Sequence, residues 1–281
     1  MNISCQRDHN WLRRRALESI YHAKSGHPGG VLSCIDIVAV LFSEILEFDF
    51  KQTDEQNRDR FILSKGHSAP ALYAVAAKVG LVDVARLNGL RKLNHEMQAH
   101  THRGTLAWVE ASTGSLGQGF SFAIGEALGL KLQSINKRVY VMIGDGESQE
   151  GEIWEGAMFA AHHKLSNLCG ILDYNKLQSD DWNENIIGIE PIRDKWEAFG
   201  WNVLEIDGHN ISQIKVAFSQ ATLEEAKPTM IVAHTIKGKG VSFMENVPSW
   251  HGSVKLSDED FEAALLELGA TKNEIEIAIH G

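Results

Sequence analysis

Two apolar runs in this sequence end in residues that could hold a metal ion and a phosphate group. The run VYVMI is followed by Gly144-Asp145-Gly146, and the run LCGILDY is followed directly by Asn175, 30 residues after Asp145. Glycines let the backbone approach a ligand closely, and the N–H groups of such a turn, Gly146 included, can point at a phosphate. The Asp145 carboxylate, the Asn175 amide oxygen and the carbonyl of Leu177 are hard oxygen donors of the kind that Mg²⁺ or Ca²⁺ takes. We therefore predict a metal–diphosphate site.

A simpler interpretation of these residues is available. Gly-Asp-Gly is common in tight turns, and Asn175 could cap a loop. Taken alone, the tripeptide favours the turn. The matching Asn175 at the end of the next apolar run reverses that balance, because a metal site needs donors from more than one segment.

The surrounding pattern predicts how these residues are positioned. Continuous apolar runs without alternation are typical of strands buried on both faces. Helical patterns separate them, as in the stretch of residues 150–164 between the two runs. Further strands are expected at FILS, WNVLEIDG and TMIVAHT, with helices near residues 12–23, 33–46, 69–78 and 211–223 and one acidic helix in the tail from residue 258. The alternation predicts an α/β fold with an open, mostly parallel sheet and helices on both faces, as a single domain over residues 1–281.

The fold also predicts where chemistry occurs. In open α/β sheets, ligands bind beyond the carboxyl ends of the strands. Polar residues follow several predicted strands: His67 follows FILS, Asp145 and Asn175 follow the central runs, and His209 and His234 lie at the last two. We expect this edge of the sheet to form the functional site.

Composition excludes several classes of function. The net charge of −10 argues against a protein that binds nucleic acid through phosphates. No secretory signal is apparent, and no run is expected to be long enough to span a bilayer. The cysteines Cys5, Cys34 and Cys169 are widely spaced, which fits neither a disulfide framework nor a zinc site. We expect a cytoplasmic protein.

Five segments together resemble the transketolases, a family of thiamine-diphosphate enzymes. Gly-Asp-Gly followed about thirty residues later by Asn is that cofactor's signature. The segments around it also resemble transketolase and occur in the family's order. They are SGHPGG, LSKGHSAPALY, EASTGSLGQGFSFAIGEAL, GDGESQEGEIWEGAMFAAHHKLSNL and KGKGVSFMEN…WHG. The resemblance implies the thiamine-diphosphate-binding fold, with Mg²⁺ or Ca²⁺ as the accompanying metal. It also implies transfer of a two-carbon ketol unit from a ketose, free or phosphorylated, to an aldose.

The resemblance assigns roles to individual residues. It places His27, His67, His100 and His251 at the active-site histidine positions. Of these, His67 and His251 are expected near the cofactor, and His27 and His100 near the sugar hydroxyls. Histidine suits proton transfer near neutral pH. The segment AHTHR departs from the family's usual GHP at His100, which leaves the role of the nearby His102 open.

The resemblance also implies contacts to the cofactor and to a partner. Gly114 and Leu116 would contact the cofactor. Glu150 matches a glutamate that meets the partner's catalytic glutamate, although an ordinary first-turn glutamate is the alternative. Transketolases are usually more than twice this long, so the pyrimidine-binding and carboxy-terminal domains are expected on a second chain, in an α2β2 assembly.

Alternatives to a split transketolase remain open at this point. They are the α chain of a 2-oxoacid dehydrogenase, a non-catalytic paralogue that acts as an assembly partner, and a magnesium-dependent phosphatase. SGHPGG together with ASTGSLGQG favours transketolase over the first. The sequence does not name the sugar, which could be a pentose phosphate, a sulfonated sugar or a branched ketose.

Overall fold

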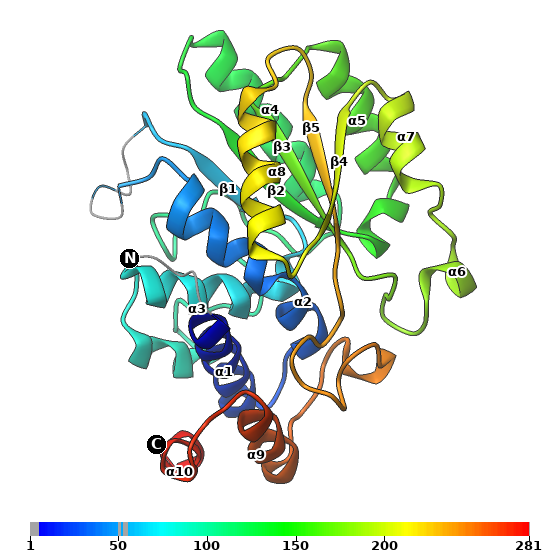
Figure 1. Cartoon of the computed structure of the whole chain (residues 1–281). Coiled ribbons are helices and arrows are strands. Elements are labelled where there is room, and N and C mark those ends of the chain that lie inside the picture. The colour runs from blue at the N-terminus through cyan, green and yellow to red at the C-terminus, as the bar shows by residue number, and fades with distance from the viewer. Residues whose placement is uncertain (1–5, 50–51, 53–55, 281) are drawn as a thin grey trace.

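A single parallel sheet organises the protein. The structure is a computed structural model that describes residues 6–49, 52 and 56–280; Cys5 and Gly281 lie outside these. Within the described residues, five strands pair in the order β1-β2-β3-β5-β4, every pair parallel (Figure 1). They are β1 (Arg60–Leu63), β2 (Val139–Gly144), β3 (Leu168–Tyr174), β4 (Asn202–Asp207) and β5 (Thr229–His234). This confirms the predicted open α/β fold, and the sheet is parallel throughout.

Helices cover both faces of the sheet. They are α1 (Gln6–Ala23), α2 (Pro28–Val40), α3 (Ala69–Val79), α4 (Gln118–Leu132), α5 (Gly151–His162), α6 (Asn183–Ile186), α7 (Ile192–Ala198), α8 (Ile211–Leu223), α9 (Asp258–Glu267) and α10 (Lys272–His280). Apolar residues of α1, α2, α3, α8, α9 and α10 share one buried cluster, and those of α4, α5 and α7 share another. Both faces of the sheet are therefore covered, although Glu205 and Asp207 of the edge strand β4 stay exposed.

Successive strand residues divide between the two clusters. On β2, Tyr140 and Met142 belong to the first cluster, whereas Val139, Val141 and Ile143 belong to the second. Side chains of a strand point alternately to opposite faces, so a strand covered on both sides needs apolar residues at every position. This is the physical reason why the runs lack alternation.

The expectation that no run reaches the length of a membrane span is wrong. The segment Pro28–Ile45, which comprises α2 and the π-helical turn Leu41–Ile45, is long and apolar enough by length and composition, and 83% of it is buried within the fold. It packs between α1, α3 and α8. A helix surrounded by other elements is apolar on all sides, so hydropathy alone does not separate it from a membrane helix.

The acidic tail forms two helices rather than one. α9 ends at Glu267, and Gly269 follows with a left-handed φ of 77°. A glycine in this conformation typically terminates a helix. The chain then turns into α10, and residues of both helices pack into the cluster that includes α1.

Candidate functional site

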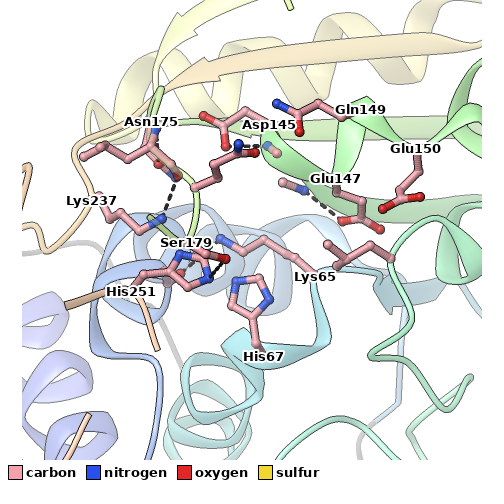
Figure 2. A pocket seen from close by; sticks show the side chains of 16 residues that line it. Lys65, His67, Asp145, Glu147, Gln149, Glu150, Asn175, Ser179, Lys237 and His251 are labelled. Carbon is pink, nitrogen blue, oxygen red and sulfur yellow. Dashed lines mark hydrogen bonds between the residues drawn. The ribbon is translucent and has the colours of Figure 1, made fainter. Parts of the chain in front are cut away.

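A cavity of about 220 Å³ lies at the carboxyl ends of the central strands (Figure 2). Parallel strands bring their carboxyl ends to one edge, so the segments after β1, β2, β3 and β5 meet there. The residues that line it are Gly30, Lys65, His67, Leu116, Gly144, Asp145, Gly146, Glu147, Gln149, Glu150, Asn175, Leu177, Gln178, Ser179, Lys237 and His251.

Asp145 begins the segment after β2 and is almost fully buried, 3% exposed. Its Oδ1 accepts a hydrogen bond from the Gly146 N–H at 2.8 Å, and its Oδ2 accepts one from the Lys176 N–H. Burial raises the pKa of the Asp145 carboxyl to about 6, although nearby Lys237 lowers it. A cation beside a buried carboxylate stabilises its charged form.

The other two predicted donors lie on the adjacent strand end. The Asn175 side chain is buried; its Oδ1 accepts a hydrogen bond from the Leu177 N–H at 3.1 Å, and its Nδ2 lies 3.4 Å from Asp173 Oδ2. The carbonyl of Leu177 accepts a hydrogen bond from Lys237 Nζ at 2.7 Å. The three predicted oxygen donors therefore reach one cavity from neighbouring strand ends.

Glu147 joins the turn after β2 to the glycine-rich loop before α4. It is 2% exposed, its Oε1 accepts hydrogen bonds from the Gly117 N–H at 2.9 Å and from Ser64 Oγ, and its Oε2 accepts one from the Gly144 N–H at 3.0 Å. Burial raises the pKa of this carboxyl against the opposing effect of those donors. One side chain thus connects three segments of the site.

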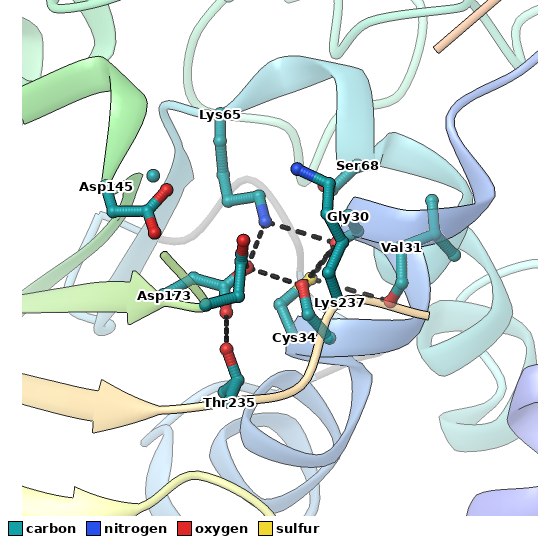
Figure 3. A network of polar contacts seen from close by, with 12 residues as sticks. Gly30, Val31, Cys34, Lys65, Ser68, Asp145, Asp173, Thr235 and Lys237 are labelled. Atoms are coloured by element: carbon teal, nitrogen blue, oxygen red, sulfur yellow. Dashed lines mark hydrogen bonds and ion pairs between the residues drawn. The ribbon is translucent and has the colours of Figure 1, made fainter. Parts of the chain in front are cut away.

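Lys65, which lines the cavity, forms a buried ion pair with Asp173 (Figure 3). Lys65 Nζ donates to Asp173 Oδ2 and, at 3.1 Å, to the carbonyl of Gly30. Ser33 Oγ donates to Asp173 Oδ2 at 2.6 Å, and Thr235 donates to its other oxygen. Burial opposes the charge of Asp173, but Lys65 holds the pKa of the carboxyl below its usual value. The pair keeps a cation at the cavity wall.

Four predicted histidines gather beside the cavity. The ring centroids of His27, His67 and His251 lie 5.2, 5.4 and 5.8 Å apart, and His100 lies 6.3 Å from His27. Of these four histidines, His67 and His251 line the cavity itself. Ser179 Oγ lies 3.4 Å from His251 Nε2. His27 and His100 are not among the residues that line the cavity, and their expected position near the sugar hydroxyls stays a prediction.

Burial keeps these imidazoles neutral. It is the largest cause that lowers the pKa of His27 to about 4, with Arg91 second, and that of His251 to about 3, with Lys237 second. The pKa values of His67 and His100 are lowered as well, again chiefly by burial. A neutral imidazole carries an acceptor nitrogen, so each ring can accept a hydrogen bond from a hydroxyl or an N–H group.

The glycine-rich loop is shaped around the histidines. Gly114 has a φ of 138°, and a Cβ there would lie 3.2 Å from the ring of His100. Leu116 lines the cavity two residues later. Residue 114 therefore lacks room for a side chain as well as the conformation that would suit one.

Glu150 lies at the rim of the cavity and is exposed, at the amino-terminal end of α5. That position suits a residue that meets another chain, and its role remains a prediction. His102 is exposed on the loop outside the cavity. His234 is exposed near Tyr174, and His209 binds Asp36.

The sequence analysis missed three charged residues of the site, Lys65, Lys237 and Glu147. Each lies within a sequence segment that had indicated the site. These segments are LSKGH, KGKG and GDGES. A lysine that is 2% exposed, as both lysines are, marks an unusual environment, because lysine is almost never fully buried without a partner.

No group of three or more His, Cys, Asp or Glu side chains that could hold a metal occurs in the described part of the chain. The predicted set is of another kind, with one carboxylate, one amide and one carbonyl. It suits a hard cation that takes its remaining ligands from a bound phosphate.

The comparisons with known proteins agree with this geometry. The family model for the transketolase thiamine diphosphate binding domain matches residues 5–279. The chain is 42% identical over 266 residues to the 6-deoxy-6-sulfo-D-fructose transketolase subunit SqwG of Clostridium sp. (strain MSTE9), covering 95% of this chain and 96% of that protein. It is 36% identical to one subunit of the apulose-4-phosphate transketolase of Phocaeicola vulgatus, covering 94% of this chain and 93% of that protein.

Solved structures show the same fold within a longer chain. The transketolase of Leishmania mexicana superposes with a TM-score of 0.90 at 27% identity, covering 99% of this chain and 44% of that one. The chain thus spans less than half the length of that transketolase and nearly the whole of the two transketolase subunits. It belongs to the transketolase family and corresponds to its thiamine-diphosphate-binding domain.

Proposed function

We propose that this chain is the diphosphate-binding subunit of a two-chain transketolase. With a second subunit, it would transfer a two-carbon ketol unit from a ketose to an aldose through thiamine diphosphate. Support comes from two relatives of nearly equal length, each named as a transketolase subunit. Their names also motivate the partner, a chain that carries the pyrimidine-binding domain, and we propose an α2β2 assembly in the cytoplasm.

The observation that carries the proposal is one cavity lined by oxygen donors, buried lysines and histidines. Asp145, Asn175 and Leu177 fit Mg²⁺ or Ca²⁺ because all three offer hard oxygens. Lys65 and Lys237 fit the negative charge of a diphosphate. A Cβ at Gly146 would lie 2.9 Å from the Gln178 side chain, so the turn is also closely packed.

The chain's own residues have separable tasks. When bound, thiamine diphosphate supplies the carbanion chemistry that breaks and forms the carbon–carbon bond. The oxygen donors and lysines hold and orient it. His67 and His251 line the cavity, and the rings of His27 and His100 lie beside them. We propose that these histidines accept a proton from a donor hydroxyl and return one to the acceptor. Burial keeps His27 and His251 neutral in the chain without cofactor.

The test is to purify this chain alone and together with the second subunit. Thiamine diphosphate and Mg²⁺ are titrated into each sample, and ketol transfer to an aldose phosphate is assayed. The ketose donors to compare are a pentulose phosphate, 6-deoxy-6-sulfo-D-fructose and apulose 4-phosphate. We expect weak cofactor binding by the chain alone, and tight binding and transfer only in the mixture.

Two results would overturn parts of the proposal. Full activity of the isolated chain would refute the split arrangement. Cofactor binding without transfer from any of the three donors would favour the non-catalytic alternative. Native mass spectrometry of the mixture gives the stoichiometry and tests the α2β2 assembly directly.

A further inference from the structure

A second buried charge cluster lies outside the cavity, centred on Asp36 of α2. Asp36 is 4% exposed, and three side chains contact its carboxylate. Arg13 Nη2 lies 2.5 Å and His209 Nδ1 2.8 Å from Oδ2, and His9 Nδ1 lies 2.7 Å from Oδ1. Burial would raise the pKa of Asp36, but Arg13 and the hydrogen bonds hold it well below its usual value. The group is an anion.

His209 connects this carboxylate to the segment after β5. Its Nε2 lies 2.9 Å from the Ile236 N–H, a donor, so Nε2 is the acceptor nitrogen. The hydrogen of the neutral ring is therefore on Nδ1, which donates it to Asp36. The carboxylate thus fixes the tautomer in which His209 can hold Ile236.

Arg13 connects the same carboxylate to the other end of that segment. Its Nη2 binds Asp36 Oδ2, and its Nε donates to the carbonyl of Lys239 at 3.0 Å. A guanidinium presents its donors in a fixed fork, so the bond to Asp36 orients the bond to Lys239. Ile236 and Lys239 are thereby both held by partners of one carboxylate.

Lys237 lies between these two anchored residues. Its side chain is buried and reaches the cavity, where Nζ binds the carbonyl of Leu177. Gly238 next to it has a φ of 81° and donates its N–H to the carbonyl of Gly29 at 3.0 Å. A flexible lysine gains a defined position only if its backbone is fixed, because ordering such a side chain costs conformational entropy.

We propose that Asp36 is a positioning residue for the cofactor site, acting through His209 and Arg13 on the backbone that carries Lys237. This inference rests on the proposed function for its consequence, since the ammonium it places is expected to meet the cofactor. Its structural part, the anchoring of residues 236–239, stands independently of any ligand.

The first test measures that anchoring without a cofactor. Amide hydrogen exchange of residues 236–239 is compared in the wild-type chain, Asp36→Asn and Asp59→Asn. Asp59 is a matched control: it is also 4% exposed and accepts backbone hydrogen bonds, from Glu47 and Arg138, at the opposite end of the sheet. We expect exchange at Ile236 to accelerate at least tenfold in Asp36→Asn alone. Equal exchange in the two variants would overturn the proposal.

The second test measures the consequence in the complex with the second subunit. Asp36→Asn should raise the dissociation constant of thiamine diphosphate by about 10- to 100-fold, the range typical of residues that orient ligands. The kcat at saturating cofactor should stay within about threefold, a split that general loss of stability does not produce. If wild type binds no cofactor, the proposed function fails, while hydrogen exchange still decides the anchoring.

Two milder variants keep the test decisive should Asp36→Asn fold poorly. An asparagine at position 209 can still donate to Asp36, and a glutamine can still accept from Ile236. Because the two bonds act in series, His209→Asn and His209→Gln should both weaken cofactor binding. Wild-type affinity in His209→Gln would show that the bond to Asp36 is dispensable and would overturn the proposal.

Discussion

The ammonium of Lys237 lies 2.7 Å from the carbonyl oxygen of Leu177, the third predicted metal ligand. The chain's own cation thus satisfies an oxygen that also suits a metal, next to the buried Asp145 carboxylate. The two strand ends that gave the first indication of a site are therefore linked to a third, the end of β5. The segment after that strand adds the cation of Lys237 to the cavity.

Replacing Lys237 tests whether this cation holds the cofactor. Lys237→Met removes a buried positive charge from a cavity expected to bind a diphosphate, so the dissociation constant of thiamine diphosphate should rise about tenfold or more. Isothermal titration calorimetry of the two-chain complex measures it. Lys239→Met is the control, because that ammonium lies farther along the same segment, 3.5 Å from Glu245. Similar losses in both variants would contradict the assignment.

Asp145→Asn tests the predicted metal ligand. The amide oxygen can still accept one backbone hydrogen bond, so the fold should persist, but the anionic donor is lost. Cofactor affinity at fixed Mg²⁺ should fall by more than about 10- to 100-fold, which is the loss typical when a residue that only orients a metal ligand is replaced. Asp180→Asn removes an exposed charge from the segment after β3 and should leave affinity unchanged. Normal Mg²⁺-dependent affinity in Asp145→Asn would exclude this residue as the ligand.

The sequence allowed the strands and their polar ends to be predicted for a definite reason. Strands covered on both faces are apolar throughout, and parallel pairing brings their carboxyl ends together. Asp145 and Asn175 could therefore be assigned to one site before their distance was known. The order of β4 and β5 in the sheet carries no such local signature, because it depends on packing between distant segments.

The buried charges show what sequence patterns leave out. In the sequence, Glu147 resembles an ordinary acidic residue at the start of a helix. In the structure, its carboxylate connects three segments. Lys65 pairs with Asp173 across 108 positions. Such pairings depend on the packed tertiary structure, and nothing in the adjacent residues encodes them. The run Pro28–Ile45 illustrates the same limit, since hydropathy reports burial but not what surrounds the helix.

Glu147→Gln should destabilise the fold. The carboxylate accepts three hydrogen bonds, whereas the amide group has one acceptor oxygen and would direct an NH₂ at another donor. We expect the free energy of unfolding to fall by about 2–4 kcal/mol, measured by urea denaturation. Glu155→Gln, at an exposed position of α5, should change it by less than about 0.5 kcal/mol. Equal stability of the two variants would contradict the linking role of Glu147.

Gly114→Ala should disturb the substrate side of the site. The new Cβ would press on the ring of His100 at 3.2 Å, in a backbone conformation that disfavours side chains. We expect a higher KM for the sugar and a loss of about 1–3 kcal/mol of stability. In Gly80→Ala the φ of 88° is also positive, but nothing lies within 4 Å. That control should lose stability without a change in KM, and a raised KM in both variants would refute the contact with His100.

The histidine cluster predicts how stability depends on pH. Burial lowers the pKa of His27 from 6.5 to about 4, so the unfolded chain takes up this proton as the pH falls through 6.5 and the folded chain only near 4. Between those values the unfolded state binds more protons, and the free energy of unfolding therefore decreases as the pH falls. His27 should contribute about 1 kcal/mol to this loss of stability once solvent screening is allowed for, and it should contribute nothing above pH 6.5.

Urea denaturation at pH 7.5 and at about pH 4.5 measures this decrease in the free energy of unfolding. His27→Gln should show a smaller decrease than wild type, although His67 and His251 act in the same direction. Identical decreases would mean that His27 is protonated as readily in the folded chain as in the unfolded one, and would contradict the lowering of its pKa by burial.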